Sequence, residues 1–226
     1  MSETKTRFLN QVLGCLRSPR RGFESIKGED LKKGVVIILL VAAISAYAGY
    51  NYTSKTPFQL PFLSDSSASQ QMPMQAVNSD ALRTNLIIFS TLGNFIAVFT
   101  GWLLTGVILH IIARLMAGEG GLKRLLAQMG FASTPLVLQQ LLRLIDAYTI
   151  SPENLMDVRA SLALGGSLAM RFMSRAMTAF TVFGIWALIL TIMAVSVNYQ
   201  SSKRKSAIAT ILAYLVVIVV RLFLPI

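Results

Sequence analysis

The chain has very few of the residues from which most active sites are built. Its 226 residues include one cysteine, Cys15, and one histidine, His110. A lone cysteine excludes an intrachain disulfide and a metal–thiolate cluster, and a lone histidine excludes most histidine-based catalytic and metal sites. The HExxH, GxSxG and P-loop motifs are also missing from the sequence. We therefore expect no enzymatic activity, no metal and no bound cofactor.

Charged residues are also scarce, at 14% of the chain, whereas 54% of the residues are hydrophobic and the mean hydropathy is +0.61. In a soluble domain about a quarter of the residues are charged, so these values are typical of a membrane protein. The formal net charge is +11. In so apolar a chain, this excess predicts contact with a lipid bilayer and its anionic head groups rather than with nucleic acid.

The hydrophobic residues fall into five segments, each near or above the ~20 residues that cross a bilayer as a helix. The segments cover residues 34–50, 85–113, 122–147, 177–197 and 207–224. None alternates with the two-residue period of a membrane β-barrel strand. The pattern predicts an all-α, polytopic integral membrane protein with five transmembrane helices in residues 34–226. Residues 51–84 and 148–175 are then its longer external loops.

Basic residues indicate how these helices are oriented. The amino-terminal segment and the turns after the second and fourth spans hold fourteen Lys and Arg, against five in the other two connections. Loops rich in Lys and Arg stay on the cytoplasmic side of a membrane. We therefore expect a multi-pass protein of the cell membrane, with the amino terminus in the cytoplasm and the carboxyl terminus outside.

Residues 1–33 form a basic segment before the first span. Its apolar residues Phe8, Leu9, Val12, Leu13 and Leu16 recur every three to four positions, which predicts an amphipathic helix. The basic residues around them are Lys5, Arg7, Arg17, Arg20 and Arg21. Such a helix can lie in an anionic lipid interface or pack on the inner face of the bundle. Both placements, and recognition of a partner protein, remain open.

Polar residues follow one stripe along the third span, and we call this set the polar stripe. Its members are Gln128, Ala132, Pro135, Gln139, Arg143 and Asp146. Their spacing of three or four residues places them on one helix face, which must avoid lipid tails. The stripe is either a set of interhelical hydrogen bonds or the wall of a solute or proton path.

The polar stripe leads to three expectations about contacts. Pro135 should bend the third helix and free the carbonyl of Phe131, which a nearby polar group should then satisfy. Gln139 lies near the middle of the span and should form a hydrogen bond to another helix. Arg143 should pair with Asp146 or with acids beyond the span.

Small residues recur every four positions in the second span, at Gly93, Ala97, Gly101 and Thr105. Small residues at this spacing allow two helix backbones to approach closely in a membrane. The row is expected to contact another helix of the same chain, and a seam between two copies of a homo-oligomer is the alternative.

Several stretches together resemble the Yip family of membrane proteins, which is named for binding Ypt/Rab GTPases, and the prokaryotic members in particular. They are SPRRGFESI before the first span, GEGGLKRLLAQMGFASTP between the second and third, and IWALILTIMAVSVNYQSSKRKSAIATILAY at the end. The resemblance implies five spans with the amino terminus inside. In eukaryotic members it implies a vesicle-traffic scaffold that binds small GTPases. This chain lacks their Asp-Leu-Tyr-Gly-Pro-type motif and long cytosolic amino-terminal region, which speaks against small GTPase binding here.

Two functions remain as hypotheses. The first is a non-enzymatic membrane adaptor or scaffold of the Yip type. The second is a small transporter or channel for an ion or small solute, with the polar stripe as its path. The sequence does not identify the biological process, the solute or the protein partner.

Overall fold

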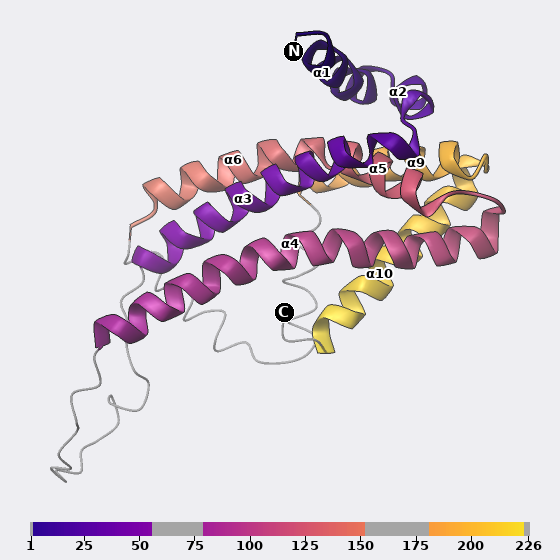
Figure 1. Ribbon diagram of the computed structural model, residues 1–226. Helices are drawn as coiled ribbons and strands as arrows, with labels where there is room; N and C mark the ends of the chain where they lie inside the picture. The colour runs from indigo at the N-terminus through magenta and orange to yellow at the C-terminus, as the bar shows by residue number, and fades with distance from the viewer. Residues whose placement is uncertain (1, 56–78, 152–180, 224–226) are drawn as a thin grey trace, which may run out of the picture.

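The computed structural model describes residues 2–55, 79–151 and 181–223 of the chain, and every regular element in these ranges is a helix (Figure 1). The helices are α1 Ser2–Arg17, α2 Pro19–Ser25, the 3₁₀ turn η1 Gly28–Asp30, α3 Leu31–Lys55, α4 Ser79–Ala117, α5 Leu122–Ala132, α6 Thr134–Thr149, α9 Val182–Asn198 and α10 Lys203–Phe223. The predicted all-α class is thus confirmed for the described residues. Most of the two predicted external loops lies outside them.

All five apolar segments contribute helices to this structure. Two stretches, Gly28–Lys55 and Ala81–Met116, are long and apolar enough to cross a membrane, and Val182–Asn198 is a shorter apolar helix. Helices α3 and α4 also extend into the ends of the predicted 51–84 loop, up to Lys55 and from Ser79. Five complete crossings remain a prediction.

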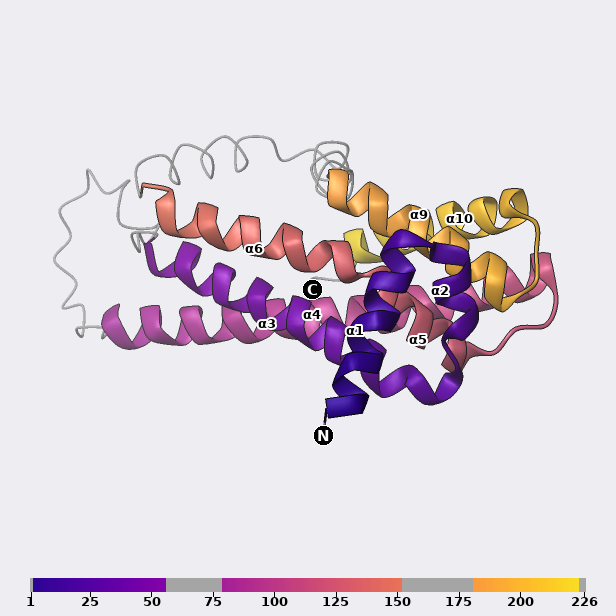
Figure 2. The ribbon, with the colours of Figure 1, turned by 90° about the horizontal axis from the view of Figure 1, so that it is seen from above.

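The helices form an elongated bundle with a pair of short helices on one side. Helices α3, α4 and α6 run next to one another, and α10 crosses α4 in Figure 1. Both views show α1 and α2 lying over α5 and α9 (Figure 2). The amino-terminal helices therefore pack on the bundle, which is one of the two placements expected from the sequence. They form two helices, because Ser18 and Pro19 separate Arg17 from the next turn.

The basic segments meet at one end of the bundle, although they are far apart in the sequence. The Asn198 side chain donates a hydrogen bond to the Gly121 carbonyl (3.1 Å), which joins the α9–α10 turn to the α4–α5 turn. Tyr199 bonds Nδ1 of His110 on α4. At the opposite end, the Lys55 ammonium donates to the carbonyls of Tyr148 and Ile150. We call the first of these ends the basic end.

Two glycines allow α3 and α5 to cross in direct backbone contact. A methyl group on Gly130 would lie 2.4 Å from Cα of Gly34, and one on Gly34 would lie 2.7 Å from the Ala127 carbonyl oxygen. Real carbon atoms do not approach so closely without a shift of the backbone. The contact places the α5 residues Ala127 and Phe131 in one buried cluster with Ile37 of α3.

Only part of the small-residue row of α4 contacts another helix in the way that its spacing predicts. Thr105 and Gly101 are buried, whereas Gly93 is exposed and a methyl group there would have no neighbour within 4 Å. The close approach on α4 lies instead at Gly106, where a methyl group would meet Leu126 of α5 at 2.3 Å. The expected contact with another helix is therefore wrong at Gly93, because the end of α3 packs on α4 at Ser90 and Asn94 and leaves Gly93 exposed.

Replacing Gly130 by alanine should lower the free energy of unfolding by about 1–3 kcal/mol, because the methyl group overpacks the crossing with Gly34. Gly93→Ala is the matched control, since its methyl group enters open space and alanine favours a helix. Unfolding by SDS in mixed micelles measures both variants. Equal stability of Gly130→Ala and Gly93→Ala would contradict the close crossing.

Candidate functional site

The polar stripe is divided into a buried half and an exposed half. Gln128, Ala132 and Pro135 are buried, whereas Arg143 and Asp146 are exposed at the far end of α6. Gln139 lies between them and is half-buried. The interior orientation expected for Gln139 and Arg143 is therefore wrong for Arg143.

The third segment is two helices rather than the single bent helix that we expected. Helix α5 ends at Ala132, and Pro135 occupies the first turn of α6. The Thr134 hydroxyl donates to the freed Phe131 carbonyl (2.7 Å), and the Ser133 hydroxyl donates to the Met129 carbonyl (2.9 Å). The predicted satisfaction of the Phe131 carbonyl is thus confirmed. The helix breaks rather than bends at this point, where Pro135 has no N–H to donate to the Phe131 carbonyl and the Thr134 hydroxyl takes its place.

Gln139 makes the expected hydrogen bond to another helix. Its Oε1 accepts from the hydroxyl of Thr181 (3.1 Å), and the same Thr181 oxygen accepts from the Gly184 amide (3.0 Å) and so caps α9. The contact therefore fixes the start of α9 against α6. The neighbouring residue Gln140 has a buried Oε1 with no partner among the described residues.

The outer members of the stripe contact a tyrosine instead of each other. The Tyr52 hydroxyl, at the end of α3, bonds the Asp146 carboxylate, and the guanidinium of Arg143 lies 5.9 Å from the centre of the Tyr52 ring. The described residues show no ion pair between Arg143 and Asp146, so this part of the expectation is wrong. Tyr52 meets both groups at once because α3 and α6 run side by side (Figure 2).

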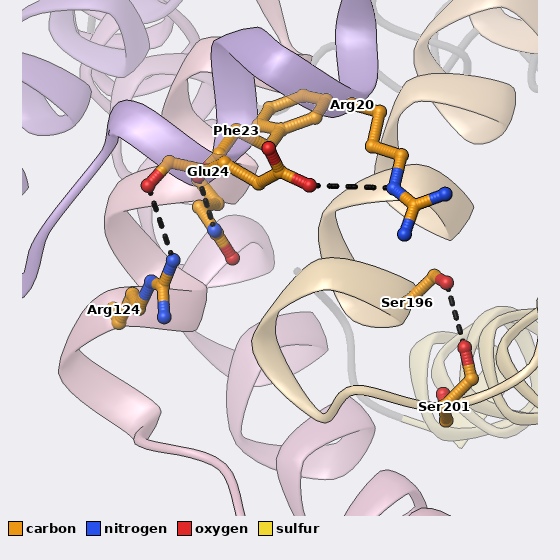
Figure 3. A network of polar contacts seen from close by, with 7 residues as sticks. Arg20, Phe23, Glu24, Arg124, Ser196 and Ser201 are labelled. Carbon is orange, nitrogen blue, oxygen red and sulfur yellow. Dashed lines mark hydrogen bonds and ion pairs between the residues drawn. The ribbon is translucent and has the colours of Figure 1, made fainter.

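The inner member of the stripe attaches the amino-terminal helices to the bundle. We call α1 and α2 together, residues 2–25, the platform. Nε2 of Gln128 donates to the Phe23 carbonyl (2.9 Å), and both side chains are fully buried. Arg124, one turn earlier on α5, donates to the carbonyls of Ile26 (3.0 Å) and Glu24 (3.4 Å; Figure 3). Side chains of α5 thus satisfy the carbonyls at the carboxyl end of α2.

The basic residues predicted to contact lipid divide into two groups. Arg17, Arg20 and Arg21 are exposed on the platform, and Arg20 pairs with Glu24 on the same helix at 3.3 Å. Lys5 and Arg7 lie on α1, and their side chains are outside the described residues. The contacts of the platform with the bundle therefore leave the three described arginines at the surface.

Sequence analysis missed three of the residues that build this region. Gly34 and Gly130 were not recognised because a glycine in an apolar helix does not reveal which helix it contacts. Phe23 acts through its backbone carbonyl as well as its ring, and a carbonyl has no signature in the sequence. Three or more His, Cys, Asp or Glu side chains do not gather into a metal-binding group anywhere in the described ranges.

Cys15 reports on how tightly the platform is closed. The thiol is fully buried, and this burial raises its pKa to about 12, so little reactive thiolate forms near neutral pH. Helices α1 and α2 meet at Gly22, where a methyl group would lie 2.6 Å from the Cys15 backbone nitrogen. Any side chain at Gly22 must therefore push the two helices apart.

We expect Cys15 to react with N-ethylmaleimide at least about a hundredfold more slowly in the native protein than in SDS at pH 7.5. Gly22→Ala should open the platform and raise the native rate. Gly14→Ala is the control, because its methyl group would meet its nearest neighbour at an ordinary 3.8 Å. Native rates that are the same in both variants would show that α1 and α2 are not closely packed.

Comparison with known proteins supports one assignment. The family model of the Yip1 domain matches residues 13–224, which is nearly the whole chain and includes the end of α1, α2, α5 and all the apolar helices. No curated protein and no solved structure matches the chain. The matched range covers all three stretches in which the sequence resembles Yip proteins. The chain therefore belongs to the Yip1 domain family of membrane proteins.

Proposed function

We propose that this protein is a non-enzymatic membrane adaptor, with the platform as its working surface. The observation that carries the proposal is the attachment of the platform by the buried Gln128–Phe23 hydrogen bond and by Arg124. These contacts hold Arg17, Arg20 and Arg21 at the surface in one arrangement. A rigid basic surface beside a membrane bundle is suited to gathering lipids or proteins there.

The proposed location of the bundle is the plasma membrane. In the proposed orientation, the basic end faces the cytoplasm. Its support is the excess of Lys and Arg in the segments that meet at this end, which hold fourteen, against five in the other two connections. The amino terminus is then inside and the carboxyl terminus outside.

Anionic lipid is the proposed first partner of the platform. On the side of α1 away from the bundle, Leu9 and Leu13 are 52% and 44% exposed, and Arg17 follows one turn later. Exposed leucines next to arginine are typical of a helix that lies in an anionic interface. Phe8 and Val12 on the other side pack on the buried cluster around Phe131. The helix can therefore contact bundle and lipid at the same time.

A transporter is the second candidate, and the broken third segment favours it. Discontinuous helices with unpaired polar groups line the substrate sites of many transporters. The break between α5 and α6 and the unpartnered Oε1 atoms of Gln128 and Gln140 fit that pattern. The adaptor is the better supported of the two, because Gln128 and Gln139 bond groups on other helices and thus act as structural contacts.

Gln139→Leu distinguishes the two functions. As a structural contact, Gln139 should contribute about 0.6 kcal/mol, so the variant should be slightly less stable and should leave proteoliposome fluxes of protons and small cations unchanged. The control is Gln140→Leu, which removes a buried oxygen without a partner and should not lower stability.

The transporter hypothesis predicts a different result for Gln139→Leu. Wild-type proteoliposomes would show a flux above protein-free liposomes, and Gln139→Leu would abolish it while the protein stayed folded. That result would overturn the adaptor as the main function.

A further inference from the structure

A cavity of about 200 Å³ opens at the basic end, between α2 and the turn that joins α9 to α10. Arg20 comes from α2, Met193, Ser196 and Val197 come from α9, and Ser201, Ser202 and Lys203 come from the turn and the start of α10. In Figure 3 the Arg20 side chain extends from α2 toward the side of α9 that carries Ser196. Two parts of the chain that are distant in sequence, α2 and residues 193–203, thus line one cavity.

The charges of the cavity favour an anion. Two basic residues, Arg20 of α2 and Lys203 at the start of α10, line the cavity, and none of its lining residues is acidic. Glu24 pairs with Arg20 along α2, but this pair is exposed and such pairs are weak. An incoming anion can therefore share or replace the Glu24 carboxylate.

Hydroxyl groups add directional donors to these charges. Ser202 Oγ accepts a hydrogen bond from the Lys205 amide (3.4 Å), which leaves the Ser202 proton to donate to a ligand. The Ser196 hydroxyl donates to the Ser201 carbonyl (2.7 Å) and so holds the turn in shape beneath the cavity (Figure 3). Arginine, lysine and serine around one hollow are the donor set that proteins use for phosphate oxygens.

The remaining wall is apolar and points to the source of that phosphate. Met193 and Val197 lie one turn apart on α9, and both also pack against the buried cluster around Phe23. Free phosphate has no apolar group that could contact these side chains, whereas a phospholipid carries its glycerol and acyl carbons directly beside the phosphate. The cavity is also smaller than the roughly 300–1,000 Å³ of sites for larger ligands, as suits a head group.

We propose that this cavity binds the phosphate of an anionic phospholipid. Arg20 and Lys203 bind the phosphate oxygens, Ser202 donates a hydrogen bond, and Met193 and Val197 contact the glycerol end. The inference rests on the proposed contact of the platform with anionic lipid and adds a defined pocket to it. A lipid held there would join the platform to the start of α10, two elements that contact each other little without it.

The test measures lipid binding to the full chain in a neutral detergent. Native mass spectrometry detects the bound lipid, with phosphatidylglycerol compared with phosphatidylcholine. The pocket variant is Arg20→Gln with Lys203→Gln. The control is Arg21→Gln with Arg204→Gln, which removes the same charge from adjacent exposed positions outside the cavity. The pocket variant should weaken the tightest phosphatidylglycerol site about tenfold more than the control does.

A second experiment, with free phosphate, distinguishes a lipid phosphate from a soluble one. Inorganic phosphate, compared with chloride at equal ionic strength, should raise the thermal stability of the wild type little. If phosphate stabilises the wild type but not the pocket variant, and phosphatidylglycerol binds no better than phosphatidylcholine, the lipid assignment is overturned and a soluble phosphate takes its place.

The remaining outcomes separate the pocket from the broader lipid contact. If the pocket variant and the control weaken phosphatidylglycerol binding equally, the pocket is overturned. A diffuse attraction between the platform and anionic lipid then remains. A wild type that prefers neither lipid, with no effect of phosphate, overturns both the pocket and the proposed lipid contact.

Discussion

The backbone contact between Gly34 and Gly130 determines where α5 lies, and the basic end is built around α5. Helix α5 has 11 residues, or about 16 Å, and cannot cross a membrane by itself. Pressed against α3 at this crossing, it contacts α9 on another side and the platform above (Figure 2). Gln128 and Arg124 then face the carbonyls at the end of α2. A side chain at either glycine would lift α5 from α3 and move these donors.

The two ends of the bundle are held by different kinds of contact. At the basic end, the buried amide of Gln128 and the half-buried guanidinium of Arg124 bond backbone carbonyls at the end of the platform. At the other end, exposed tyrosines connect α3 to α6, as when Tyr47 bonds Tyr148 and Tyr52 bonds Asp146. Tyrosines of this kind are typical of membrane–water interfaces, where one side of the ring is apolar and the hydroxyl is wet. The proposed lipid site therefore lies at the end where backbone carbonyls, and not only exposed side chains, join the helices.

The parts of this structure that could be predicted from sequence are those with a local signal. Long apolar runs predicted helices, and Pro135 correctly marked the irregular point of the third segment. The full break required Thr134 to satisfy the freed Phe131 carbonyl, which depends on side-chain geometry. Arg143 and Asp146 have the spacing of a pair, yet Tyr52 from another helix intervenes. Which glycines touch, and which carbonyl Gln128 meets, depend on how distant helices cross.

A double-mutant cycle at Gly34 and Gly130 tests the central claim most directly. If the two glycines share one contact, the first methyl group separates α3 and α5, and the second then costs little. The account predicts that Gly34→Ala with Gly130→Ala lowers the free energy of unfolding by clearly less than the sum of the single changes. Additive losses would mean that the two glycines act at separate places, and would contradict the claim that their contact seats α5.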